Sequence, residues 1–369
     1  MFALTHPSFA EFTEELGLLG LELTTADDPG AAAFAVLKAA SVERWLLVPL
    51  QSRTVAAAAL RMLTPMSPRS RLAKSAVLAL NSLGLRRPWA RNRIYLRVAA
   101  PRRCIHNWSM AAFFSGTPGP ERKITVQLRS ADSSRNAYLK MACAPLANQL
   151  ITNEVRALQA AKDLELKTAI LPTILGFTKF GSRRSCICSD ETRSGFKAVR
   201  MLGGVHFDFL EEMAAKATVP VSRQYVDSLR QRHEAVAQTL APTLDRLAVG
   251  VLDELSRIVD RGTVHGAMSH GDFTPWNCVV AGLRLYVFDW ELSGLHPLGY
   301  DHLHFLVSTG ASDAEVLSRL MQDRWYGGSA DGARFLLLSY FLAKMFSSAS
   351  GAGDMLLKLM AETGKTTRW

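Results

Sequence analysis

The chain has 369 residues, 48% of them apolar, with five cysteines and a net charge of +10. This apolar content supports a large buried core and excludes an intrinsically disordered protein. No run of about 18 uncharged apolar residues is present, and the first residues lack the basic and apolar regions of a secretion signal, so we expect a cytoplasmic protein with reduced cysteines.

The positive charge is concentrated in one segment. Residues 44–120 contain thirteen Lys or Arg and no Asp or Glu. Such a segment attracts phosphates, an acidic glycan or an anionic membrane surface, which allows a peripheral location at the inner membrane. A solvated basic face that supports solubility is the alternative. Nucleic acid is disfavoured as a partner because no zinc-finger, RNP-type or helix-turn-helix signature accompanies the charge.

Residues 1–105 are predicted to form an accessory module of mixed α/β structure. An acidic, apolar helix is expected at 7–23, a strand at 44–49, and two Ala/Leu-rich helices at 54–63 and 71–83. For the last helix, packing on the next domain and contact with a membrane surface both stay open.

Residues 106–192 have the alternation and turn residues of an antiparallel sheet with one helix, at 146–164. Strands are expected at 110–114, 123–129, 137–142, 173–180 and 185–189.

One lysine in this region stands inside an apolar strand, where its charge is costly unless it is paired. Glu154 follows Lys140 by fourteen residues and is placed on the predicted helix. We therefore expect an ion pair between the two side chains. An exposed lysine on an edge strand is the alternative, because alternation alone does not fix the face that Lys140 occupies.

Residues 193–369 are predicted to be mainly helical, with a long pattern over 222–261 that is interrupted near Pro242. The segment 269–293 breaks this pattern with a loop and two short strands. A β-rich half followed by a helical half suggests two lobes with a cleft between them.

The segment 269–293 carries the groups that suit metal-dependent chemistry. Asp272 and Asn277 are separated by a Pro-containing loop, and an apolar strand ends at Asp289. A hairpin turn at 281–284 would bring Asn277 and Asp289 to the same end of two strands. Their oxygen ligands suit magnesium, which leaves Asp272 to orient an acceptor hydroxyl and accept its proton. His270 is expected to brace the loop.

These residues resemble a known family. His270-Gly271-Asp272 with Asn277 is similar to the catalytic loop of the aminoglycoside phosphotransferase/choline kinase superfamily, and Phe288-Asp289-Trp290-Glu291 resembles its metal-binding segment. The resemblance implies an α+β, protein-kinase-like two-lobed fold, with the α/β module of residues 1–105 added. The nucleotide-binding lobe would span 106–192, and the helical lobe with the catalytic loop and metal site would span 193–369.

The resemblance also implies the roles of the site residues. Asp272 would be the catalytic Asp, and Asn277 and Asp289 would hold Mg²⁺. Lys140, paired with Glu154, would bind the phosphates of ATP. Gly116, Thr117 and Gly119 lie in the turn that would cover these phosphates, although the G-x-G-x-x-G pattern is absent and a plain hairpin turn is the alternative.

The implied function is ATP- and magnesium-dependent transfer of the γ-phosphate to a hydroxyl of a small polar molecule. A sugar or a sugar-linked intermediate is a candidate, because the motifs also resemble kinase-like proteins encoded among bacterial polysaccharide genes. A catalytically inactive kinase-fold protein that binds an anionic partner through residues 44–120 is the alternative. A protein kinase is disfavoured because Trp290-Glu291 replaces the Phe-Gly of that class.

Overall fold

The computed structural model describes residues 6–38, 43–63, 68–99, 107–130, 135–192, 196–199, 201–323, 327–347 and 352–361. The chain separates into two compact units. Unit 1 comprises Met1–Gln159 and Leu171–Arg193, and unit 2 comprises Ala160–Ile170 and Ser194–Trp369.

Unit 1 is built on a nine-stranded antiparallel sheet in the order β1-β4-β2-β3-β5-β6-β7-β10-β9. Its strands are β1 (Leu21–Thr24), β2 (Ala32–Lys38), β3 (Trp45–Pro49), β4 (Arg93–Val98), β5 (Trp108–Phe114), β6 (Lys123–Ser130), β7 (Asn136–Ala142), β9 (Ile174–Phe180) and β10 (Arg183–Asp190). The pairing of β3 with β5 joins the strands of the first hundred residues to those that follow, so one continuous sheet runs through both regions.

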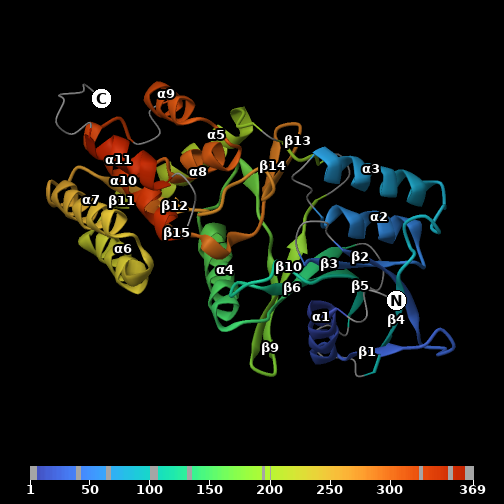
Figure 1. Cartoon of the computed structure of the whole chain (residues 1–369). Helices are drawn as coiled ribbons and strands as arrows, with labels where there is room; N and C mark the ends of the chain where they lie inside the picture. Colours follow the sequence, from blue (N-terminus) through green and yellow to red (C-terminus); the bar gives the residue numbers. More distant parts are fainter. Residues whose placement is uncertain are drawn as a thin grey trace. The chain divides into compact units, whose positions relative to one another are not determined.

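Helices cover both faces of this sheet (Figure 1). They are α1 (Pro7–Leu18), α2 (Arg53–Arg61), α3 (Pro68–Ser82) and α4 (Pro145–Asp163), whose last four residues belong to unit 2. Successive side chains of a strand point to opposite faces. Accordingly, Phe34 and Leu47 pack in the cluster that includes α1, whereas Ala35 and Leu46 pack in the cluster under α2.

The predicted helix at 7–23 is shorter than expected. Helix α1 ends at Leu18, and Gly20 adopts a left-handed backbone with φ of 82° before β1 begins at Leu21. A left-handed glycine ends a helix readily because it has no Cβ. Strands β1, β2 and β4 were not predicted from the sequence.

Unit 2 is mainly helical, with two small sheets. Its helices are α5 (Gly204–Ala217), α6 (Arg223–Val236), α7 (Pro242–Asp260), α8 (Tyr300–Ser308), α9 (Asp313–Asp323), α10 (Ala330–Phe346) and α11 (Ala352–Ala361). The sheets are β11-β12-β15 (Val219–Pro220, His265–Ser269, Gly294–Pro297) and β13-β14-β8 (Cys278–Ala281, Arg284–Val287, Ala169–Ile170). Apolar residues of α7 and α10 form the centre of its core. Among the described residues, no helix combines the length and apolarity needed to cross a membrane.

Candidate active site

A braced loop connects β12 to β13 in unit 2. Gly271 has a φ of 82°, and a Cβ at this position would lie 2.1 Å from the carbonyl oxygen of Leu292, so only glycine fits. The buried carboxylate of Asp301, on α8, accepts hydrogen bonds from the backbone N–H groups of His270 (2.7 Å) and Gly271 (3.0 Å). Burial raises the pKa of Asp301 to about 7, although the two hydrogen bonds that it accepts act to lower this pKa.

His270 fastens the same loop from the inside. Burial lowers the pKa of His270 to about 4, so the ring is neutral near pH 7. Its Nε2–H donates to the carbonyl of Phe288 (2.9 Å), and its Nδ1 accepts from the N–H of Asp272 (3.2 Å). With both nitrogens engaged inside the protein, His270 serves as the brace that the sequence suggested.

Asp272 is held by two side chains while remaining partly open to solvent. Its Oδ2 accepts from the amide of Asn277 (2.8 Å), and its Oδ1 contacts Nε2 of His304 (2.7 Å). The carboxylate side chain is 30% exposed. This arrangement fixes the carboxylate and still leaves it accessible to a reactant.

Asn277 and Asp289 flank the β13–β14 hairpin. Cys278 pairs with Val287, and the N–H of Phe288 donates to the carbonyl of Asn277 (3.0 Å), so both residues lie at the same end of the hairpin. The amide nitrogen of Asn277 is engaged by Asp272, which leaves its side-chain oxygen as the potential metal ligand. Asp289 adopts a left-handed backbone, with φ of 70°, directly before the short helix η3 (Trp290–Leu292).

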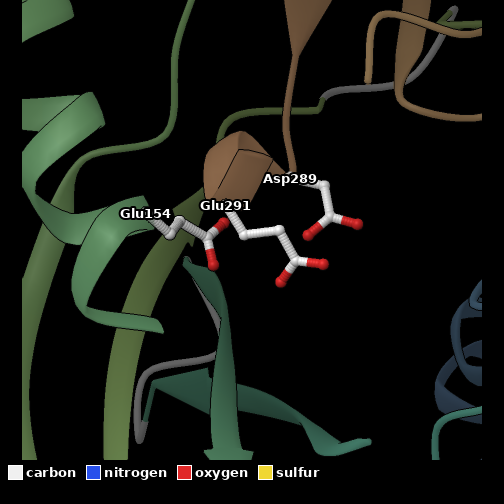
Figure 2. A group of neighbouring side chains, drawn as sticks. All are labelled: Glu154, Asp289 and Glu291. Carbon is white, nitrogen blue, oxygen red and sulfur yellow. The ribbon is translucent and has the colours of Figure 1, made fainter. Parts of the chain in front are cut away.

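Glu291 is a second carboxylate at this position. Its carboxylate and that of Asp289 have oxygens within 4.8 Å of each other, and Figure 2 shows both side chains extending from the start of η3. Carboxylate and amide oxygens are hard donors of the kind that Mg²⁺ takes in nucleotide-binding sites.

Unit 1 contains the ion pair proposed from the sequence. Lys140, on β7, lies with its Nζ 2.5 Å from a carboxylate oxygen of Glu154, on α4. The exposed fractions of the two side chains are 14% and 1%. Because a buried charge is costly without a partner, each side chain fixes the other in place. Figure 2 labels Glu154 on α4.

The turn between β5 and β6 contains Gly116, Thr117 and Gly119. Gly116 has a φ of 72°, and a Cβ there would lie 2.1 Å from the carbonyl oxygen of Lys123, so the turn itself requires this glycine. Thr117 and Gly119 are exposed, and nothing lies within 4 Å of a Cβ placed on Gly119. The role of this turn in covering phosphates stays a prediction.

Comparison with known proteins identifies the matched region. Residues 207–336 match the model of the phosphotransferase enzyme family, APH. The matched residues lie within unit 2. The match bears out the resemblance of these residues to the predicted superfamily, and the structural likeness below confirms the predicted fold. A search of curated proteins found no match to the chain.

Solved structures of aminoglycoside phosphotransferases have a similar fold. A thermostable mutant of APH(4)-Ia in its apo form matches with 15% identity and a TM-score of 0.52, over 70% of this chain and 97% of that chain. A ternary complex of a thermostable mutant of the same enzyme with AMP-PNP and hygromycin B gives 15% identity and a TM-score of 0.52, over 70% and 96%. A choline/ethanolamine kinase family protein from Mesorhizobium loti gives 14% identity and a TM-score of 0.41, over 64% and 84%.

Within unit 2, the structure groups the predicted residues tightly. Asp272 and Asn277 are hydrogen-bonded, and both Asp272 and Asp289 lie close enough to His270 to influence its pKa. In unit 1, Lys140 pairs with Thr125 on β6, two residues beyond the start of the strand that follows the Gly116–Gly119 turn. This places the turn and the ion pair at one end of the same strands.

The sequence did not reveal the role of His304 in unit 2. Burial lowers the pKa of His304, so its ring is neutral. With Nε2–H donating to Asp272, Nδ1 accepts from the hydroxyl of Tyr340, on α10 (3.0 Å). Asp301 and His304 stand three positions apart on α8, at i and i+3, which places both on one face of the helix. This spacing was the available signal.

Acid should destabilise unit 2. Burial lowers the pKa values of His270 and His296 to about 4, and it also lowers that of His302. A histidine whose pKa is lower in the folded state than in the unfolded state stabilises the fold. This contribution is fully present at pH values above the unfolded-state pKa of 6.5, and it is lost as the pH falls toward the folded-state pKa of about 4. The free energy of unfolding should therefore decrease across this window.

His270→Gln tests this pH dependence. Gln keeps a donor for the carbonyl of Phe288 but cannot take up a proton. We expect a lower free energy of unfolding at neutral pH and a pH slope smaller by about one proton, measured by denaturant unfolding across the window. Identical slopes in the variant and the wild type would contradict the assignment.

Proposed function

We propose that the chain is an ATP- and magnesium-dependent phosphotransferase that transfers the γ-phosphate to a hydroxyl of a small polar molecule, such as a sugar or a sugar-linked intermediate. The observation that carries the proposal is the carboxylate of Asp272, which Asn277 and His304 hold in a fixed orientation while it stays 30% exposed. A positioned carboxylate of this kind orients a hydroxyl and accepts its proton during phosphoryl transfer.

The remaining residues would bind and neutralise the nucleotide. Asn277, through its side-chain oxygen, and Asp289 would hold Mg²⁺, with Glu291 as a further oxygen donor. When bound, the ion neutralises charge on the phosphate oxygens. Lys140, kept in place by Glu154, would contact the phosphates, and the turn at Gly116, Thr117 and Gly119 would lie against them.

The proposed proton transfer uses groups within unit 2. The acceptor hydroxyl donates to the free lone pairs of the Asp272 carboxylate. The proton passes to this carboxylate as the acceptor oxygen bonds to the γ-phosphorus and the bond from that phosphorus to the bridging oxygen breaks, which releases ADP. His304 keeps the carboxylate oriented because its neutral ring donates to Oδ1 and is held by Tyr340. The residues that bind the phosphates would stabilise the negative charge that develops on the transferred group.

Transfer from γ-labelled ATP to two sets of acceptors tests the proposal. We expect label on small polyhydroxy compounds, sugars first among them, no label on protein acceptors, and loss of all transfer when EDTA removes the metal. Label on proteins alone would overturn the small-molecule assignment. Mg-ATP binding without transfer to any acceptor would favour the inactive binding protein.

A further inference from the structure

The outer face of α3 in unit 1 is apolar and exposed. Helix α3 packs through Val77 and Leu78 on the cluster that includes α2, which itself lies on β3 and β5 (Figure 1). Its opposite face carries small apolar and leucine side chains at helical spacing, and all of them are exposed: Leu72, Ala73, Ala76, Ala79 and Leu83. The face therefore reverses the usual pattern, in which the outward side of a surface helix is polar.

Three leucines at this face are largely open to water. The exposed fractions are 74% for Leu72, 69% for Leu83 and 52% for Leu85. Leu83 continues the last turn of α3 through a hydrogen bond from its N–H to the carbonyl of Ala79 (3.1 Å), so it belongs to the same helical face. Exposed apolar patches rimmed by polar residues mark sites of contact with a partner or a membrane.

Positive charge surrounds this face. Arg69 is exposed one turn before Leu72, and Arg87 and Arg91 are exposed shortly after Leu85. The guanidinium of Arg53, at the start of α2, lies against Gly84, between Leu83 and Leu85 in the chain. The sequence from 44 to 120 contributes no carboxylate to offset these charges.

We propose that this face, defined by Leu72, Leu83 and Leu85 with Arg53, Arg69 and Arg87, docks on an anionic lipid bilayer. A polyanion such as a glycan or a nucleic acid would use the arginines and leave the leucines in water. A bilayer uses both, because leucines enter the boundary between headgroups and acyl chains while arginines contact the anionic headgroups. The helix would lie in the plane of the surface. This docking is independent of the proposed phosphotransfer.

Flotation of the full chain with lipid vesicles tests the proposal. We expect binding to vesicles of phosphatidylcholine with phosphatidylglycerol, little binding to phosphatidylcholine alone, and weaker binding at high salt. The double variant Leu72→Ser/Leu83→Ser should bind at least about tenfold more weakly, because both apolar anchors are lost. Arg69→Gln/Arg87→Gln should weaken binding by about fivefold for each arginine.

The control variant is Leu175→Ser/Arg156→Gln, which removes an exposed leucine and an exposed arginine from β9 and α4. It should bind vesicles as the wild type does, and all variants should show the wild-type thermal unfolding. No binding to anionic vesicles, or equal binding by the leucine variant, would overturn the proposal. So would heparin or DNA binding without vesicle binding, or a wild-type dimer that the leucine substitutions dissociate, measured by light scattering.

Discussion

Replacing Asp272 with Asn should reduce phosphoryl transfer by about a hundredfold to ten-thousandfold, because Asn cannot accept the proton of the acceptor hydroxyl. The two side chains have the same shape, so the fold should remain. The wild-type carboxylate accepts two hydrogen bonds, from Asn277 and from His304, and an amide group offers only one acceptor oxygen. We therefore also expect a loss of stability of about 1–3 kcal/mol.

The two effects are separated by measuring them on the same variant. Product formation at saturating Mg-ATP gives the loss of rate, and thermal unfolding followed by circular dichroism gives the loss of stability. Asp253→Asn is the matched control. The side chain of Asp253, on α7, is 60% exposed, and its carboxylate makes a long ion pair of 3.7 Å with the guanidinium of Arg230, so its removal should have little effect. Transfer by Asp272→Asn at the wild-type rate would remove Asp272 from the reaction.

Replacing Lys140 with Met should destabilise unit 1 by about 3–5 kcal/mol and remove nucleotide binding. The side chain of Glu154 is 1% exposed, so the substitution leaves its carboxylate buried without the ammonium group that lies 2.5 Å away. A buried carboxylate without an opposite charge beside it is strongly destabilising.

A second substitution distinguishes stability from binding. In Lys140→Met/Glu154→Gln no charge of the pair remains, so much of the lost stability should return while Mg-ATP binding stays absent. Denaturant unfolding and calorimetric titration measure the two properties. Lys179→Met, at an exposed position on β9, is the control and should change neither. Wild-type affinity in the double variant would mean that Lys140 does not contact the nucleotide.

Most of unit 1 from residue 108 onward could be predicted because its strands alternate apolar and polar residues between clear turns. The strand that carries Lys140 and the helix that carries Glu154 were placed within a few residues, which allowed the ion pair between them to be proposed. Strands β1, β2 and β4 lacked this signal. The leucines of β1 continue the pattern of α1, and the break between them depends on the left-handed backbone of Gly20.

The candidate site was predictable where its residues are local in sequence. Asp272, Asn277 and Asp289 lie within one loop and one hairpin, so turn chemistry and strand pairing were sufficient to bring them together. The contact between His304 and Asp272 depends on how α8 packs against the loop, and no pattern in the intervening residues encodes that packing directly. Glu291 required the geometry of η3, which the sequence alone does not specify.

Thermal unfolding with and without saturating Mg-ATP, on the wild type and on Asp289→Asn, tests the proposed metal-dependent nucleotide site most directly. Asn is the suitable replacement because it tolerates the left-handed backbone at this position. A ligand at a hundred times its Kd stabilises by about 2.7 kcal/mol, which corresponds to a shift of several degrees. We predict a magnesium-dependent shift in the wild type that is strongly reduced in Asp289→Asn. No shift in the wild type, or an equal shift in both proteins, would contradict the proposed function.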